Sequence, residues 1–290
     1  MRRKKTLIKA TWDLLRLEHG FMLAIAVFIG ALIAGKGFLP IEKLIYACLT
    51  PIFLEAATFA LNDYFDFEID KENKRMDRPL VRGDLKPKHA LIFFSTMFPL
   101  GLLFSFFVNT ICFLIALLTG FLAIAYDIKM KKVKLIGNFY ISYTMAIPFI
   151  FGGTVISTHI PVIVYIIAAI AFLSGSGREI MKDIMDYRGD RKKGVKSLPI
   201  YIGLKSSVFI INVFYLSAVA ISIIPFVLLV DKSYYHNYLY LCTVLLADIL
   251  FVYVVVDLSL KKEQNINIYR KITLLAMFIG LIAFLLGGFT

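Results

Sequence analysis

Two Asp-rich segments with the same spacing are the parts of this sequence best suited to chemistry. In each segment aspartates recur as D-x-x-D-x-x-x-D, and the second segment follows the first by 120 residues. If each segment continues a preceding helix, offsets of three and four residues place its carboxylates along one face, where neighbours can share a cation. The members of the two rows are Asp63, Asp66 and Asp70, and Asp183, Asp186 and Asp190; Asn62 joins the first row.

Such rows of oxygen ligands favour a hard cation, Mg²⁺ or Ca²⁺, over zinc. Magnesium held by one or two carboxylates usually completes its coordination with water and phosphate oxygens. Two rows that face each other would therefore clamp a diphosphate better than they would hold a bare structural ion. Basic side chains in the same segments could neutralise the outer phosphate oxygens. These are Arg75, Arg78, Lys182, Arg188 and Lys192.

Apolar stretches separate the charged segments and indicate what positions them. With 59% hydrophobic residues, the chain exceeds the roughly 45–50% apolar usage of soluble domains. The stretches have the length that crosses a hydrocarbon core of about 30 Å as a helix. The sequence therefore predicts an all-α integral membrane protein with nine transmembrane helices. The stretches lie near residues 20–35, 41–61, 89–107, 110–126, 139–157, 161–177, 205–230, 237–257 and 271–289.

The repeated segments also bear on how the chain is organised. Because one offset separates all three aspartate pairs, we expect two related halves, about residues 1–157 and 158–290. Both halves would belong to a single membrane domain that spans residues 1–290.

The basic residues behind the net charge of +12 are distributed unevenly between the two sides of the membrane. Among the 32 Lys and Arg residues, all but Lys36, Lys43 and Lys232 fall on one side of the nine predicted helices. This asymmetry places the N-terminus and the Asp-bearing loops in the cytoplasm and the C-terminus outside, in a multi-pass cell-membrane protein. The basic excess is therefore explained without nucleic acid, and it favours contact with membrane lipid.

The motifs resemble those of the UbiA superfamily of intramembrane prenyltransferases. The resemblance rests on Asn62-x-x-x-Asp66-x-x-x-Asp70 followed by Arg78-Pro79-Leu80, and on Asp186-x-x-x-Asp190 followed by Ser197-Leu198-Pro199 and Gly203. It implies a nine-helix, ring-like bundle with a central cavity, capped on the cytoplasmic side by the two Asp-bearing loops.

The same resemblance implies the roles of individual residues. Tyr126, with Lys132 in the basic loop after it, matches the third characteristic region of the family, and Arg16 matches an Arg that reaches the substrate headgroup. The ring face of Tyr126 could stabilise an allylic cation. The implied Mg²⁺-diphosphate ligands are Asn62, Asp66, Asp70, Asp186 and Asp190, with Asp63 and Asp183 as further members.

The acceptor is also suggested by resemblance. The block Arg178–Asp186 is most similar to archaeal enzymes that transfer geranylgeranyl from its diphosphate to geranylgeranylglyceryl phosphate, which forms the second ether bond of archaeal membrane lipids. It is less similar to members that act on hydroxybenzoate, haem or chlorophyll precursors, so an aromatic or other lipid-soluble acceptor is the alternative. No general base can be assigned from the sequence.

Two other classes of protein remain open at this stage. A secondary transporter or cation channel would place ionisable residues near the bilayer midplane, where Glu55 and Asp248 are the main candidates. A magnesium-binding structural or lipid-interaction protein would need the Asp rows but no reaction.

Overall fold

The computed structural model describes residues 2–193, 195–260 and 265–289, and within these ranges every regular element is a helix. Nine of the described helices, α2, α3, α5, α6, α7, α8, α10, α11 and α12, are long and apolar enough to cross a membrane. The predicted all-α class and the nine spans are therefore confirmed. In chain order the elements are α1 (Arg2–Leu15), α2 (Leu17–Ala34), α3 (Ile41–Glu72), α4 (Pro79–Arg82), α5 (Pro87–Val108), α6 (Thr110–Ile128), η1 (Met130–Lys132), α7 (Lys134–Ile156), α8 (Val162–Lys193), α9 (Leu198–Ile202), α10 (Leu204–Val227), α11 (Tyr238–Leu260) and α12 (Ile266–Gly288).

Two helices are much longer than a membrane requires, and both carry an Asp row. α3 and α8 each contain 32 residues, a length of about 48 Å compared with a hydrocarbon core of about 30 Å. Their last turns must therefore extend beyond the hydrocarbon. Each row continues the helix that precedes it, whereas the predicted apolar stretches ended at residues 61 and 177 and left both rows in loops.

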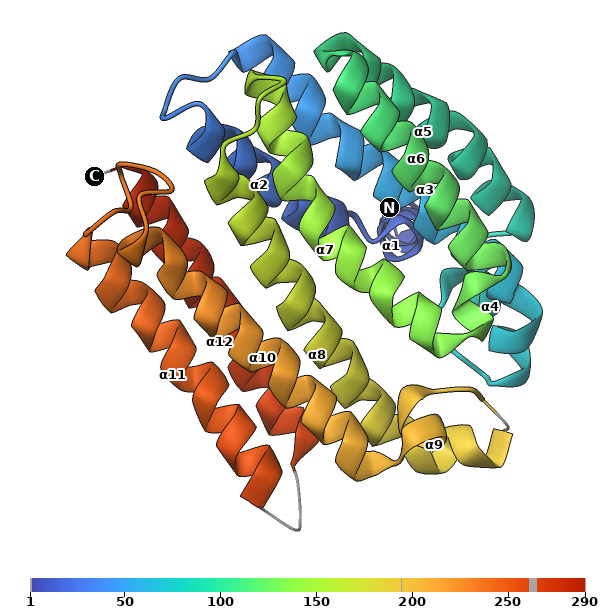
Figure 1. Ribbon diagram of the computed structural model, residues 1–290. Coiled ribbons are helices and arrows are strands. Elements are labelled where there is room, and N and C mark those ends of the chain that lie inside the picture. The colour runs from blue at the N-terminus through green and yellow to red at the C-terminus, as the bar shows by residue number, and fades with distance from the viewer. Residues whose placement is uncertain (1, 194, 261–264, 290) are drawn as a thin grey trace.

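The helices pack in two groups that meet along α7 and α8 (Figure 1). In the first group α2, α3 and α6 pack against α7, and α5 packs against α3 and α6; in the second α10 and α12 pack against α8, and α11 packs against α10 and α12. The ends of α3 and α8, the short α4 and α9 and the α6–α7 connection all lie at the same end of the bundle (Figure 1). This end gathers the polar segments that the sequence singled out.

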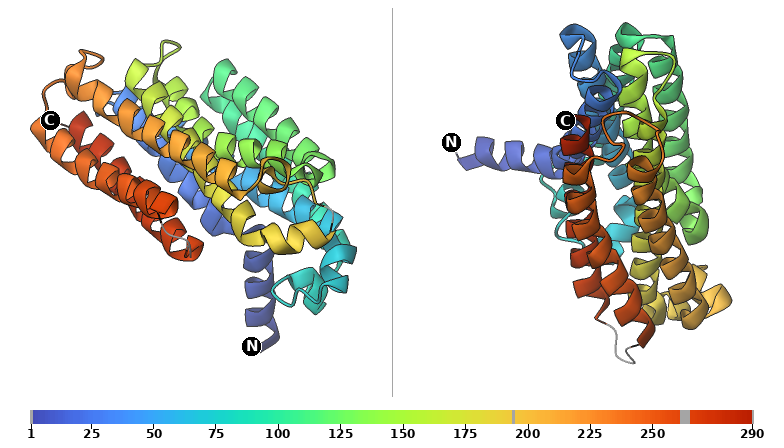
Figure 2. Two further views of the ribbon diagram at one scale, coloured as in Figure 1. Left: turned by 60° about the horizontal axis from the view of Figure 1, so that its bottom comes forward. Right: turned by 60° about the vertical axis from the view of Figure 1, so that its left-hand side comes forward.

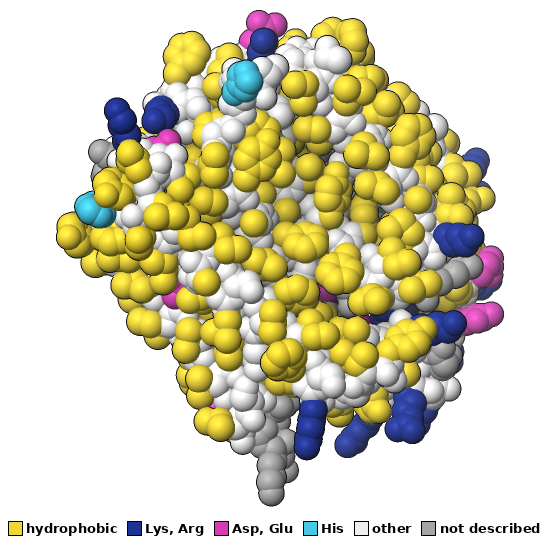
Figure 3. All heavy atoms as spheres, in the orientation of Figure 1, with side chains coloured by type: hydrophobic (Ala, Val, Ile, Leu, Met, Phe, Trp, Pro, Cys, Tyr) yellow, Lys and Arg dark blue, Asp and Glu magenta, His cyan; other side chains and the backbone are white. Residues whose placement is uncertain are grey.

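The outer surface suits a lipid environment. Large apolar side chains such as Phe106, Phe121, Phe209 and Phe278 are more than half exposed. Figure 3 shows hydrophobic side chains over most of one face, with most of the visible Lys and Arg side chains along its lower right edge. The protein is a multi-pass membrane protein, and its basic side chains gather at the Asp-bearing end.

α2 and α7 cross with their backbones in direct contact. A Cβ atom added at Gly152 would lie 2.0 Å from the carbonyl oxygen of Val27, and one added at Gly30 would lie 2.2 Å from that of Phe149. Each glycine thus faces the backbone of the other helix. Such close approach is a typical way for small residues to join transmembrane helices.

Candidate active site

The first aspartate of the α3 row is held by two arginines. Asp63 is 2% exposed, and its Oδ1 accepts hydrogen bonds from Arg16 at 2.5 Å and from Arg78 at 3.0 Å. Arg16 forms the corner between α1 and α2, with a left-handed φ of 44°, and its guanidinium lies 4.4 Å from the ring centroid of Phe59. Asp63 therefore fixes two cationic side chains from different segments at the end of α3.

The other two aspartates of this row are closer to solvent. Asp66 Oδ1 accepts from Lys131 Nζ at 2.6 Å, and Asp70 forms ion pairs with Arg78 at 3.5 Å and with Arg75 at 3.8 Å. The hydrogen bond from Arg75 also holds the pKa of the exposed Asp77 below its usual value. Every carboxylate of the row thus has a basic partner, as the clustering of like charges requires.

The α8 row is arranged in a similar way around one lysine. Lys134 Nζ lies 2.6 Å from Asp190, 3.4 Å from Asp183 and 3.7 Å from Asp186. Asp183 is 2% exposed and also accepts a hydrogen bond from Asn138 at 2.7 Å. In both rows, therefore, the first aspartate is buried and bonded to protein donors, whereas the middle one, Asp66 or Asp186, is accessible.

The donor set of the two rows fits a divalent cation. Lys131 and Lys134 each place an ammonium group 2.6 Å from a carboxylate oxygen, which marks two positions where positive charge is stabilised. All the acidic ligands are oxygens, as Mg²⁺ prefers. Among the described residues, no three His, Cys, Asp or Glu side chains already converge on one point. A metal ion would therefore take over carboxylates that now pair with basic side chains.

Asn62 has a partner that sequence analysis missed. Its Nδ2 donates to Oδ1 of Asp127 at 2.8 Å, and Asp127, near the end of α6, is only 4% exposed. This bond turns the carbonyl oxygen of the Asn62 amide away from Asp127, where it is available to a cation or a donor. The predicted apolar stretch ended at residue 126, so Asp127 was assigned to the loop and not considered.

This pairing predicts the outcome of exchanging the two side chains. Asp127→Ala should lower the Mg²⁺-dependent activity expected of this site by about 10–100-fold, the usual effect of losing a group that orients a metal ligand. The double exchange Asn62→Asp with Asp127→Asn restores the bond in the opposite direction and should recover part of that loss. Steady-state rates of the Ala variant, the two single exchanges and the double exchange, measured at several Mg²⁺ concentrations, test this. A double variant less active than either single exchange would contradict the assignment.

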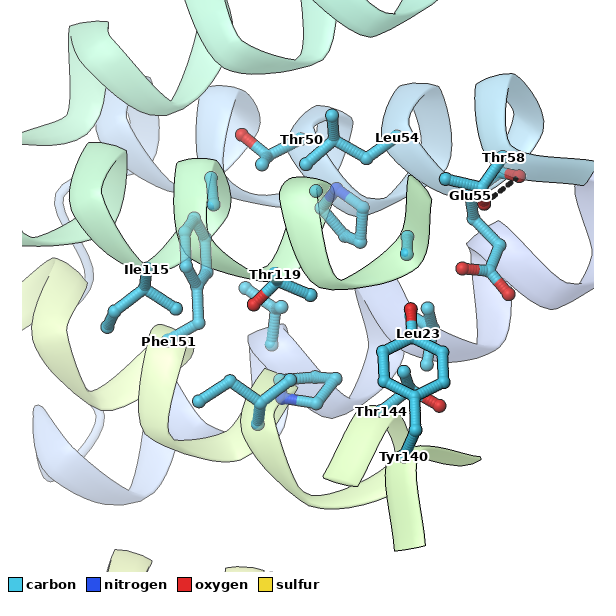
Figure 4. Close-up of a pocket in the computed structure, with 17 residues that line it drawn as sticks. Leu23, Thr50, Leu54, Glu55, Thr58, Ile115, Thr119, Tyr140, Thr144 and Phe151 are labelled. Atoms are coloured by element: carbon cyan, nitrogen blue, oxygen red, sulfur yellow. Dashed lines mark hydrogen bonds between the residues drawn. The ribbon is translucent and has the colours of Figure 1, made fainter. Parts of the chain in front are cut away.

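An apolar pocket lies among α2, α3, α6 and α7 (Figure 4). The empty space within it, including space open to the surroundings, is about 580 Å³, and its lining is mainly apolar. Glu55 and Tyr140 point toward one another at one end of it (Figure 4). Tyr140 stacks on Tyr126 with ring centroids 4.8 Å apart, so Tyr126 lies beside the pocket. The ring-like arrangement around one central cavity stays a prediction.

The remaining predicted site residues have fewer contacts with the Asp rows. Lys182 is exposed and lies 3.6 Å from Glu179, and Arg188 and Lys192 are exposed on α8. The side chain of Lys132 lies outside the described part of the chain. Its neighbours Lys131 and Lys134 contact the Asp rows, and so does Asn138. The sequence signal for these three was only their place in or next to a basic loop on the Asp-bearing side.

The comparison with protein families agrees with these features. The model of the UbiA prenyltransferase family matches residues 23–282. The chain belongs to the UbiA prenyltransferase family. It is a prenyltransferase, and not a transporter, a channel or a purely structural protein. Membership of the family is compatible with both classes of acceptor.

Relatives of this UbiA family member are similar over their whole length. The digeranylgeranylglyceryl phosphate synthase of Archaeoglobus fulgidus is 43% identical over 290 residues, which cover 100% of this chain and 98% of that protein. The synthase of the same name from Pyrococcus horikoshii is 33% identical over 282 residues, covering 97% and 98% of the two chains.

Solved structures of the family share the fold. One, from work on digeranylgeranylglyceryl phosphate synthase in membranes, superposes with a TM-score of 0.85 at 33% identity, covering 100% of this chain and 99% of the other. A UbiA homolog from Archaeoglobus fulgidus bound to DMAPP and Mg²⁺ gives a TM-score of 0.61 at 17% identity, covering 94% and 98%. At that identity the likeness concerns the fold alone.

Proposed function

We propose that this enzyme transfers the geranylgeranyl group of geranylgeranyl diphosphate to the free hydroxyl of geranylgeranylglyceryl phosphate. The product would carry the second ether bond of an archaeal membrane lipid. The observation that carries this proposal is the 43% identity, over the full chain, to a protein named digeranylgeranylglyceryl phosphate synthase. The pocket among α2, α3, α6 and α7 has a mainly apolar lining, which is the chemistry that an isoprenoid chain requires.

The proposed metal site uses the accessible and outer members of the two rows. Asp66 and Asp70 on α3 and Asp186 and Asp190 on α8 would hold Mg²⁺, with the carbonyl oxygen of Asn62. The related homolog bound to DMAPP and Mg²⁺ supports this choice of ion. When bound, Mg²⁺ neutralises the charge that develops on the departing diphosphate. Asp63 and Asp183 are better suited to positioning, because protein donors already occupy them.

Basic residues would hold the diphosphate. With the carboxylates held by a cation, Lys131 and Lys134 would be free to bind phosphate oxygens, and Arg75 and Arg78 lie next to the α3 row. The ion pairs with Asp63 hold Arg16 and Arg78 at the proposed diphosphate site. Fixed positive groups of this kind stabilise the leaving group more strongly than water does, because they need no reorganisation during the reaction.

The proposed transfer breaks one bond and forms one. The C1–O bond of the donor breaks, and its electron pair leaves with the diphosphate. The acceptor oxygen then bonds to C1 while its proton passes to a carboxylate or to the diphosphate. The apolar pocket would exclude water from the allylic cation, and the rings of Tyr126 and Tyr140 would offer it their faces.

We further propose that the Asp-bearing end faces the cytoplasm and the C-terminus faces outside, as the distribution of basic residues favours.

Incubation of the purified protein with its proposed substrates tests the reaction. With Mg²⁺, geranylgeranyl diphosphate and geranylgeranylglyceryl phosphate, we expect mass spectrometry to detect digeranylgeranylglyceryl phosphate and an equal amount of diphosphate. Chelation of Mg²⁺ by EDTA should stop both. Prenylation of 4-hydroxybenzoate in place of the glyceryl phosphate would favour the aromatic alternative. No product with either acceptor would refute the proposal.

A further inference from the structure

The N-terminal helix runs in a different direction from all the spans. α1 ends at Leu15, and the left-handed backbone of Arg16 turns the chain sharply into α2. Figure 2 shows α1 projecting crosswise from the side of the bundle, whereas the long helices run side by side. Because those helices cross the membrane, α1 extends along the membrane plane.

The length of α2 places α1 at the boundary between lipid and water. α2 has 18 residues and is about 27 Å long, close to the thickness of the hydrocarbon core, about 30 Å. Its first residue, Leu17, therefore lies near one edge of the hydrocarbon. α1 also packs against α3 and α4, so this edge is the one from which the Asp-bearing end of α3 emerges.

The side chains of α1 divide between the bundle and its surroundings. Ala10 and Leu14 are fully buried, whereas Leu7, Ile8 and Trp12 are 53%, 71% and 46% exposed. Trp is enriched where a membrane meets water. At this level an apolar face can be covered by the lipid that already surrounds the spans.

The charges of the segment complement an anionic surface. In residues 1–15 the basic residues are Arg2, Arg3, Lys4, Lys5 and Lys9. The one acid, Asp13, is paired with Arg82 at 2.7 Å. Basic segments next to a membrane are attracted by anionic headgroups, and helices with both features lie in the interface.

We propose that α1 is an interfacial helix that binds the anionic phospholipid surface on the Asp-bearing side of the membrane. Leu7, Ile8 and Trp12 insert among the lipids at the depth of the headgroups and upper acyl chains. Asp13 of α1 pairs with Arg82 of α4, and Arg16, between α1 and α2, is bonded to Asp63. By holding α1, the lipid surface thus helps to keep Arg16, at the turn between α1 and α2, in position beside the first Asp row. This inference rests on the membrane fold and not on the proposed substrates.

The single Trp of the chain provides the test. Trp12 is the only tryptophan of the chain, so selectively excited fluorescence of the full-length protein, in nanodiscs whose scaffold protein has no tryptophan, reports on α1 alone. The lipids carry bromine near the headgroup or near the chain ends, and the discs are anionic or zwitterionic. We expect a blue-shifted emission, loss of fluorescence mainly with bromine near the headgroup, and stronger loss in anionic discs. Aqueous acrylamide should quench weakly.

Two variants serve as controls. Phe121, 59% exposed in the middle of α6, supplies a deep reference as Phe121→Trp in a Trp12→Phe background. It should be quenched best by bromine near the chain ends. Replacing Arg2, Arg3, Lys4 and Lys5 by Gln should remove the preference for anionic discs. The proposal is overturned if acrylamide quenches Trp12 and bromolipid does not, if neither quenches it because protein covers it, or if wild type shows no preference for anionic lipid.

Discussion

Asp66→Asn and Asp186→Asn should each lower prenyl transfer by at least about 100-fold, the usual effect of removing one group that stabilises charge in a transition state. Both substitutions keep the size of the side chain and remove its charge. Asp66 and Asp186 are the accessible middle members of the two rows, with side chains 27% and 50% exposed. Their loss should therefore leave the fold intact while it weakens the binding of Mg²⁺ and diphosphate.

The measurement separates this effect from unfolding. Initial rates with geranylgeranyl diphosphate give the loss of activity, and calorimetric titration with Mg²⁺ and inorganic diphosphate gives the loss of binding. Glu68→Gln is the matched control, because Glu68 is an exposed acid on the same helix, and it should retain wild-type rates. If either Asp variant bound diphosphate and turned over as the wild type does, the proposed role of its row would be wrong.

Gly152→Ala should destabilise the protein by about 3 kcal/mol or more, at the upper end of the usual cost of overpacking. The new methyl group would lie 2.0 Å from a backbone oxygen of α2. No side-chain rotation can relieve that contact, so α2 and α7 must move apart. Because α2 and α7 both line the pocket, its shape should change as well.

Thermal unfolding of the detergent-purified protein tests this prediction. Gly189→Ala in α8 is the control, since a Cβ atom there meets nothing within 4 Å. This variant should unfold at the wild-type temperature or slightly above, because Ala favours helix over Gly. Equal unfolding temperatures for Gly152→Ala and the wild type would mean that the two helices are not in backbone contact.

The fold was predictable from the sequence because lipid imposes a simple length requirement on each apolar stretch. The offsets of three and four residues indicated a shared face on the condition that the helices continue through the Asp rows, and α3 and α8 do continue through them. The repeat of that spacing in α8 singled out the second half of the candidate site. These features depend on local sequence, which helical geometry converts directly into position.

The partners of the aspartates were not predictable in the same way. Arg16 reaches Asp63 across 47 positions of the sequence, and Asn138 reaches Asp183 across 45. Such contacts depend on how the helices pack, which one sequence does not specify. The run of lysines after α6 gave no signal for Lys131, which contacts the first row, or for Lys134, which begins α7 and contacts the second.

The α6–α7 connection sets a condition on chain length as well as on residue type. Lys131 and Lys134 come from one short segment but compensate different helices, α3 and α8. Inserting or deleting a single residue between them would move one ammonium group away from its row. The number of residues between Lys131 and Lys134 therefore has to match the distance between the two Asp rows. The spacing of these lysines is constrained by the geometry of the site, as is the spacing of the aspartates.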